Sequence, residues 1–166
     1  NNNICLQSAK TLTPARILMI PATLIRDLLG EDHDFMKAVV FELASAYRRT
    51  VKELKNQKLR SGTERLANWL LREERGQGGE GCLTIPFEKR VLAAYLGMTA
   101  ENLSRGFSAL SAHGVNIKGL QVDITDIAKL ADYARPSPLI DEDEPQFPGT
   151  FGTSLTAERS DDDDTV

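Results

Sequence analysis

The sequence predicts a mainly α-helical protein with a small amount of β-structure, in which a long helix leads into a winged helix-turn-helix domain. Three patterns carry this prediction. A heptad-like apolar spacing runs through residues 31–60, two short helices around a tight glycine turn occupy residues 88–112, and a β-hairpin pattern follows them. Two short helices joined in this way form a helix-turn-helix, and the hairpin adds a wing.

The charge of the chain is unevenly distributed. Of its 166 residues, 41% are hydrophobic and 27% charged, which is typical of a soluble globular protein. The net charge of −4 alone argues against a nucleic-acid partner. However, residues 136–166 hold nine acidic residues and one arginine, whereas residues 1–135 hold 19 basic and 15 acidic residues. Residues 1–135 therefore carry a net charge of +4, and the tail 136–166 carries −8. We expect this tail to be disordered, and either to keep the protein soluble or to compete for the basic surface.

The first 30 residues are predicted to be the end of a larger unit. Ile4–Leu6 and Ile17–Ile20 have the composition of short strands, and two strands alone cannot bury a core. Pro21 suits the first position of a short helix over residues 22–29, which Gly30 would end. Since the chain starts with Asn1 and with part of a sheet, we expect it to be a fragment of a longer protein.

Residues 31–60 are predicted to form one long dimerisation helix. Its apolar positions are spaced 4, 3, 4 and 3 residues apart, as in the seam of a two-stranded coiled coil: Val40, Ala44, Tyr47, Val51 and Leu54. A helix of this length spans about 40 Å, which is too long for so small a domain to cover. A helix packed against its own domain is the alternative.

Residues 61–135 are predicted to form the winged helix-turn-helix domain. Ser61 and Glu64 have the spacing of a capping box and begin its first helix. The glycine-rich run 76–81 lacks the lysine and hydroxyl ending of a phosphate-binding loop and is interpreted as a connection. The second of the two short helices begins at Thr99 and contains Gly106, which we expect to pack closely against the preceding helix.

The outer face of that second helix carries the candidate DNA-binding residues. Glu101, Asn102, Ser104 and Arg105 occupy its first two turns, the part of a recognition helix that enters a major groove. Arginine can bind guanine O6 and N7, glutamate can accept from cytosine N4, and serine can contact either kind of base edge. Three further residues are candidates for phosphate contacts: Thr99, Lys89 and Lys118. An ordinary solvated face with an ion pair between Glu101 and Arg105 is the alternative.

Residues 55–133 resemble the C-terminal half of a Crp–Fnr family transcription regulator. The similar segments are SGTERLANWLL, LTIPFEKRVLAAYLGMTAENLSRGFSAL and HGVNIKGLQVDITDIAKLA. The spacing of Glu101, Ser104 and Arg105 is similar to that of the oxygen-responsive, Fnr-like branch. The resemblance implies a homodimer on a pseudo-palindromic operator with TTGA-like half-sites, RNA polymerase as a partner, and residues 1–30 as the remnant of a sensor β-roll.

Other classes of function find little support in the sequence. Cys5 and Cys82 match neither a disulfide framework nor a zinc spacing, so we expect a reducing cytoplasm. His33 and His113 have no second ligand nearby and are interpreted as structural or solvated. We expect no enzyme activity, metal or cofactor in this chain and no membrane span, and the effector of the sensor region is not assigned.

A protein-interaction module is the alternative from a different class. In that reading, the coiled coil forms a dimer and the winged helix docks another protein without specific DNA binding. A steep decrease of DNA affinity with salt would distinguish the two readings, because neutralising phosphates releases counterions.

Overall fold

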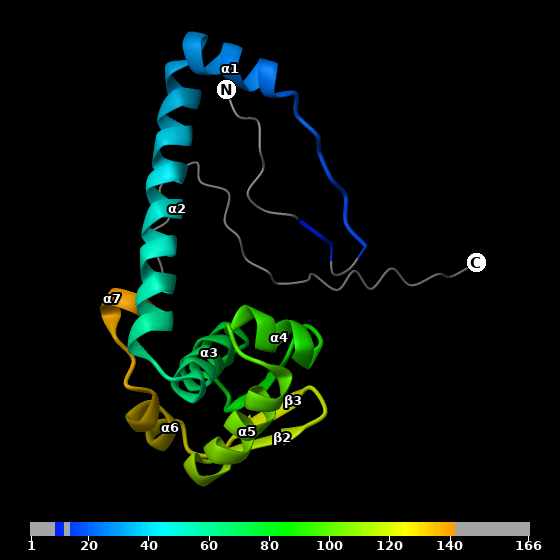
Figure 1. Ribbon diagram of the computed structural model, residues 1–166, viewed down its shortest axis with the longest axis vertical. Coiled ribbons are helices and arrows are strands. Elements are labelled where there is room, and N and C mark those ends of the chain that lie inside the picture. The colour runs from blue at the N-terminus through cyan, green and yellow to red at the C-terminus, as the bar shows by residue number, and fades with distance from the viewer. Residues whose placement is uncertain (1–8, 12–13, 142–166) are drawn as a thin grey trace, which may run out of the picture.

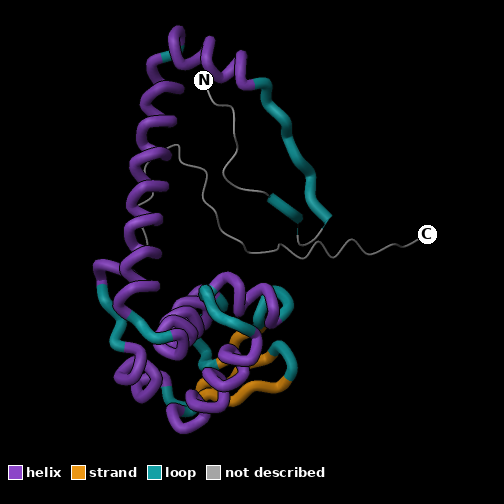
Figure 2. Tube along the Cα trace, viewed as in Figure 1, coloured by secondary structure: helices purple, strands orange, loops and turns teal. Residues whose placement is uncertain are grey.

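The computed structural model describes residues 9–11 and 14–141. Two helices form an extended arm, and the remaining helices with a three-stranded sheet form a head at its end (Figures 1 and 2). The predicted fold class, mainly helical with a small sheet, is confirmed. Among the described residues, no helix is both long enough and apolar enough to cross a membrane.

The arm consists of α1 (Ala22–Glu31) and α2 (His33–Leu59). Gly30 was expected to end the first helix, but α1 continues to Glu31 and ends at Asp32. The reason is local: the side chain of Asp32 accepts hydrogen bonds from the backbone N–H groups of Asp34 and Phe35, at 2.9 and 3.0 Å. A capping aspartate begins the new helix at this residue and so defines the corner between the two helices.

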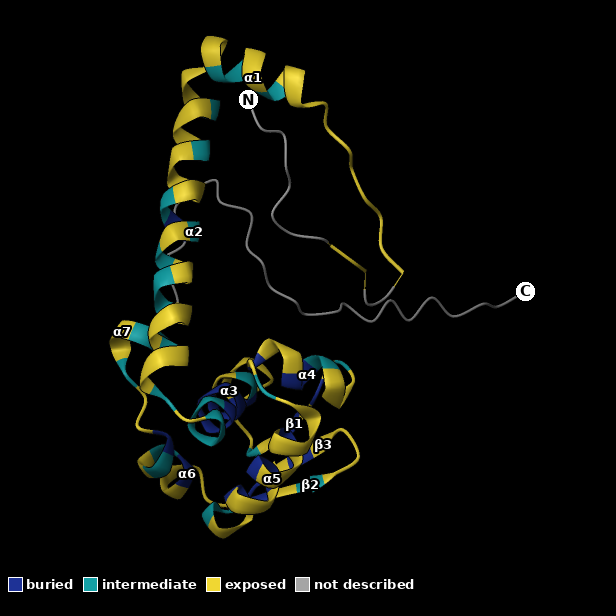
Figure 3. Cartoon of the chain, viewed as in Figure 1, coloured by how far each residue is buried: buried dark blue, intermediate teal, exposed yellow. Residues whose placement is uncertain are grey.

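The long helix is exposed over most of its length (Figure 3). The seam residues Val40, Tyr47 and Leu54 are 58, 72 and 56% exposed, whereas Ala44 and Val51 of the same seam are half-buried. Dimerisation through this face therefore stays a prediction, with packing inside the chain as its alternative.

The strand expected at Ile17–Ile20 is not formed. Residues 14–20 have no regular secondary structure, and all of them are exposed. A strand needs a neighbour for its backbone hydrogen bonds, and no described segment pairs with this one. The other expected strand, Ile4–Leu6, lies outside the described residues.

The head begins with α3 (Gly62–Gly76), whose N-terminus forms the predicted capping box. The Glu64 N–H donates to Ser61 Oγ at 3.2 Å, and the Ser61 N–H donates to Glu64 Oε2 at 2.7 Å. Two shorter helices, α4 (Lys89–Tyr95) and α5 (Ala100–Leu110), form the helix-turn-helix, and a 3₁₀ turn (Ser111–His113) follows. The core between these helices includes the fully buried side chains Leu66, Leu70, Leu92, Leu103 and Leu110.

The wing is part of a three-stranded antiparallel sheet. Its strands are β1 (Cys82–Thr84), β2 (Val115–Lys118) and β3 (Gln121–Ile124), in the order β1-β3-β2. Val122 of the central strand lies opposite Leu83 on one side and Ile117 on the other. Its side chain is completely buried, so the sheet is anchored to the helical core through this strand.

The C-terminal part of the described chain is folded further than the sequence predicted. Helix α6 (Ile127–Ala134) is tied to α3, because buried Asn68 Nδ2 donates to the Ala134 carbonyl oxygen at 2.7 Å. The tail expected to be disordered from residue 136 instead starts with α7 (Pro138–Asp141), which packs beside the end of α2 (Figure 1). The boundary at 136 is therefore wrong, because an ion pair with a distant arginine holds this segment. Residues 142–166 lie outside the described residues.

Two large apolar side chains of the short helices in the head lie on the surface and not in the core. Tyr95 and Ile127 are 56 and 40% exposed. Both residues lie at the edge of the apolar stripe of a short helix, and side chains at that edge face the solvent.

Candidate nucleic-acid interface

Helix α5 separates a buried face from a polar face. Leu103 and Phe107 are 1 and 5% exposed and point into the core. Glu101, Asn102, Ser104 and Arg105 are all exposed. The four predicted base-reading residues therefore share one accessible surface on the first two turns of the helix.

Glu101 and Arg105 form an ion pair on this surface. Arg105 Nη2 donates to Glu101 Oε1 at 2.5 Å, and the two side chains are 74 and 73% exposed. An exposed pair one helical turn apart contributes little to stability. The ion pair instead orients the arginine. The carboxylate of Glu101 holds the guanidinium of Arg105 against the helix, while the other N–H donors of the guanidinium stay accessible.

Thr99 begins the helix as the sequence predicted. Its Oγ1 accepts a hydrogen bond from the Asn102 N–H at 3.1 Å. Accepting this bond leaves the hydroxyl proton of Thr99 free to be donated outward, beside the positive end of the helix dipole. Thr99 thus caps α5 and can also donate a hydrogen bond to an anion.

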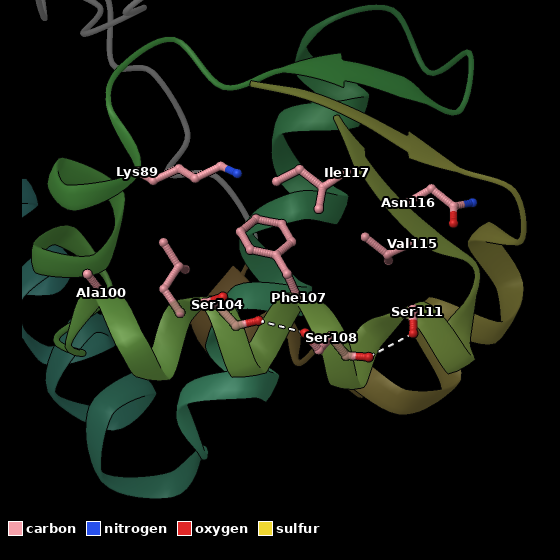
Figure 4. A pocket seen from close by; sticks show the side chains of 10 residues that line it. Lys89, Ala100, Ser104, Phe107, Ser108, Ser111, Val115, Asn116 and Ile117 are labelled. Carbon is pink, nitrogen blue, oxygen red and sulfur yellow. Dashed lines mark hydrogen bonds between the residues drawn. The ribbon is translucent and has the colours of Figure 1, made fainter. Parts of the chain in front are cut away.

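A groove of about 380 Å³ separates α5 from the wing (Figure 4). Ser104 and Asn116 line it from the two sides, and Phe107 lies at its base. Lys89 reaches across from α4, with Nζ 5.9 Å from the centre of the Phe107 ring. Lys89 and Ser104 therefore meet at one groove, whereas Lys118 is the last residue of β2 and does not line it.

Gly106 allows α5 to approach a different helix from the one expected. A Cβ at this position would lie 3.1 Å from Leu66 Cδ2 and 3.8 Å from Thr63 Oγ1, both on α3. The expected close packing exists, but against α3 and not against the preceding helix α4. At this position α5 therefore packs directly against α3.

Sequence reasoning missed the residue that holds the helix-turn-helix turn. Arg65 Nε donates to the Leu96 carbonyl oxygen at 2.9 Å, and Nη2 donates to that of Gly97 at 3.4 Å. Gly97 has a φ of 63°, a conformation that favours glycine. The local sequence around Arg65 does not indicate a partner 31 residues away, because this contact depends on how the two parts of the head pack.

The remaining candidates have structural surroundings. The ring of His113 packs against that of Tyr133, with 4.4 Å between the ring centroids and 37° between the ring planes. Within residues 9–11 and 14–141, no group of three or more His, Cys, Asp or Glu side chains could hold a metal ion. The arrangement of the head thus offers hydrogen-bond donors and acceptors on an exposed helix, with lysines beside it.

Comparison with known proteins agrees with this geometry. Residues 64–133 match the model of the Crp-like helix-turn-helix domain. This part of the chain is a Crp-like helix-turn-helix domain. The predicted resemblance is therefore confirmed, and DNA binding and transcription regulation are the functions of this type of domain.

Solved structures of similar proteins extend the comparison beyond the head. A protein from Silicibacter pomeroyi DSS-3, described as a candidate cAMP-binding regulatory protein, is 32% identical with a TM-score of 0.51. The match covers 70% of this chain and 51% of that one. A candidate cyclic-nucleotide-binding protein from Ruegeria pomeroyi DSS-3 is also 32% identical, with a TM-score of 0.52, over 71% of this chain and 52% of that one.

A more distant structure supports the fold alone. A candidate transcriptional regulator of the Crp/Fnr family from Eubacterium rectale ATCC 33656 is 18% identical, with a TM-score of 0.59, over 71% of this chain and 54% of that one. The chain spans about half the length of these relatives. No curated protein matches it significantly.

Proposed function

We propose that the chain binds a pseudo-palindromic operator as a homodimer and reads TTGA-like half-sites with α5. The observation that carries the proposal is the Glu101–Arg105 ion pair, exposed on the first turns of a helix whose opposite face is buried. In a bare surface helix such a pair has no further consequence. In a Crp-like domain it lies on the recognition helix, where side chains contact base edges.

Each side chain of the polar face has a distinct role in this proposal. Arg105 donates two hydrogen bonds to guanine O6 and N7, and Glu101 accepts one from the N4 amino group of the paired cytosine. Ser104 lies near a thymine, and Asn102 has the donor and acceptor needed for adenine. Because both partners of one G·C pair are read, that position should be the most strongly specified.

Three residues position the domain on the sugar–phosphate backbone. Thr99 donates its hydroxyl at the start of α5, and Lys89 leaves the ring of Phe107 to reach a phosphate beside the groove. Lys118 is at the end of β2, next to the turn of the wing, and contacts a phosphate there. Such contacts contribute affinity without sequence information.

Dimerisation through α2 would bring two recognition helices to one operator. The exposed seam residues Val40, Tyr47 and Leu54 have the spacing of a two-stranded coiled coil, and burying them between two chains removes apolar surface from water. Two-fold symmetry then matches a pseudo-palindromic site with half-sites about 34 Å apart. The chain would act in the cytoplasm, as its cysteine content predicts, and would contact RNA polymerase, as the resemblance implies.

Fluorescence anisotropy with labelled duplexes tests the proposal. One duplex carries two TTGA-like half-sites, and a second has the same composition in scrambled order. We expect tighter binding to the first duplex and a steep decrease of both affinities with salt. Equal affinities would contradict the proposed readout, and affinities without salt dependence would favour the protein-interaction module.

A further inference from the structure

The connection between the arm and the head is very short. Only Arg60 and Ser61 separate α2 from α3, and both have extended backbone conformations, with φ/ψ of −124°/142° and −65°/161°. The Ser61 carbonyl oxygen accepts from the Arg65 N–H at 3.0 Å as part of the cap of α3, but neither residue has the helical backbone conformation that would continue α2 into α3. The direction of the head relative to α2 therefore depends on the side chains around this junction.

The side chain of Arg60 fastens the junction to the C-terminal end of the described chain. Its Nη1 donates to Asp141 Oδ1 at 2.7 Å, and its Nη2 donates to Asp141 Oδ2 at 2.5 Å. Asp141 Oδ2 also accepts from the Ser137 N–H at 2.6 Å. The side chains of Arg60 and Asp141 are only 8 and 21% exposed, so this two-point pair is shielded from water.

The charge of Asp141 is favoured by these contacts. Burial alone would raise the pKa of its carboxyl, but the hydrogen bonds from Arg60 and from the Ser137 N–H outweigh burial and lower the pKa. The carboxylate is therefore ionised at neutral pH, and the pair is present under ordinary conditions.

The backbone of the same junction is bonded to the helix-turn-helix. Arg65 Nη1 donates to the Arg60 carbonyl oxygen at 2.8 Å, while its Nε donates to the Leu96 carbonyl oxygen in the turn before α5. Arg60 is thus held through its side chain by α7 and through its carbonyl by the residue that orients the turn. A change in the angle between α2 and α3 therefore has to break or displace one of these two contacts.

We propose that Arg60 and Asp141 are positioning residues, which fix the angle between the dimerisation helix and the recognition helix. This inference rests on the proposed function, since a fixed angle matters when two recognition helices have to reach two half-sites at once. With the pair intact, one pose of the head is favoured. Without it, the head samples several poses, and operators with altered half-site spacing are bound almost as well as the correct one.

A distance measurement by pulsed electron paramagnetic resonance tests the angle directly. Spin labels at Ala38→Cys and Ala109→Cys, both exposed alanines on α2 and α5, are placed in the full chain with Cys5 and Cys82 replaced by serine. Dilution with unlabelled chain leaves one labelled subunit per dimer. We expect a broader distance distribution for Asp141→Asn than for the unmodified chain, and an unchanged one for Asp132→Asn, which removes an exposed charge from α6.

A second variant and a DNA assay separate positioning from a merely structural role. Arg60→Lys keeps the charge but cannot form two parallel hydrogen bonds, so it should also broaden the distribution. Asp141→Asn should reduce the affinity ratio between the correctly spaced operator and one with two inserted base pairs by about fivefold, within the range by which single residues alter coupling. Asp141→Glu should restore part of this ratio.

The possible results decide between the two proposals. Unchanged distance distributions and spacing ratios in both Asp141→Asn and Arg60→Lys would overturn the positioning role. If the unmodified chain binds no operator specifically, the proposed function fails, and the distance distributions still decide whether the pair fixes the angle.

Discussion

Arg105 donates to Glu101 at 2.5 Å on the exposed side of α5, one turn of helix apart. Fixing a flexible arginine side chain before DNA is bound reduces the entropy that binding would cost. The pair therefore supports the proposed recognition of one G·C base pair by Arg105 and Glu101.

Arg105→Ala should relax specificity at one guanine of each half-site. The loss should amount to about 1–3 kcal/mol on the specific operator, with little change on scrambled DNA. Anisotropy titrations on both duplexes measure this difference. Arg26→Ala, which removes an arginine from α1 at the far end of the arm, is the matched control (Figure 1). Equal losses on both duplexes would contradict a base-reading role.

Lys89→Ala should weaken binding to every sequence by a similar factor. Its ammonium group carries one positive charge beside the groove, so the slope of log affinity against log salt should decrease by about 1. Titrations at several salt concentrations measure this slope. Lys129→Ala, an exposed lysine on α6, should leave the slope unchanged. A loss confined to the specific duplex would show that Lys89 does not act through phosphate.

Gly106→Ala should destabilise the head, although alanine is the better helix former. The added Cβ would lie 3.1 Å from Leu66 Cδ2, so the fully buried side chain of Leu66 would have to shift within the packed core. Overpacking of this kind costs about 1–3 kcal/mol, against a gain in helix propensity of about 1 kcal/mol. Thermal unfolding followed by circular dichroism measures the net effect. Gly76→Ala, where a Cβ meets nothing within 4 Å, should not lower the melting temperature.

The capping box of α3 should make the stability of the head depend on pH. The N–H of Ser61, which donates to the carboxylate, lowers the pKa of Glu64 below its usual value of 4.5. Because the pKa of Glu64 is lower in the folded chain than in the unfolded chain, its charge stabilises the folded state at pH values above the unfolded-state pKa. This contribution is lost as the pH falls through the folded-state pKa. The difference in unfolding free energy between the unmodified chain and Glu64→Gln should therefore be largest above pH 4.5 and decrease below it. A difference independent of pH would contradict this role of the charge.

Features that depend on neighbours in the sequence were predicted well. The caps at Thr99 and Ser61 depend on backbone N–H groups only three residues further along the chain. The four base-reading candidates share one face because helical periodicity places them there. Their accessibility follows from the same periodicity, although their contacts with DNA stay predictions.

Features that depend on distant partners were not predictable in this way. The strand-like composition of Ile17–Ile20 indicates a preference, but a strand forms only where another strand pairs with it. Arg60 and Asp141 are 81 residues apart, and a tail rich in acidic residues gives no reason to single out one carboxylate. The contact of Gly106 with Leu66 likewise depends on how α5 crosses α3.

Selection of bound sequences from random DNA tests the central claim most directly. The account predicts enriched sequences with two inverted TTGA-like half-sites, centred about one helical turn apart, and one strongly preferred G·C pair in each half-site. Selection with Arg105→Ala in parallel should lose the preference at that pair and retain the rest. Recovery of sequences without any shared pattern would contradict the account.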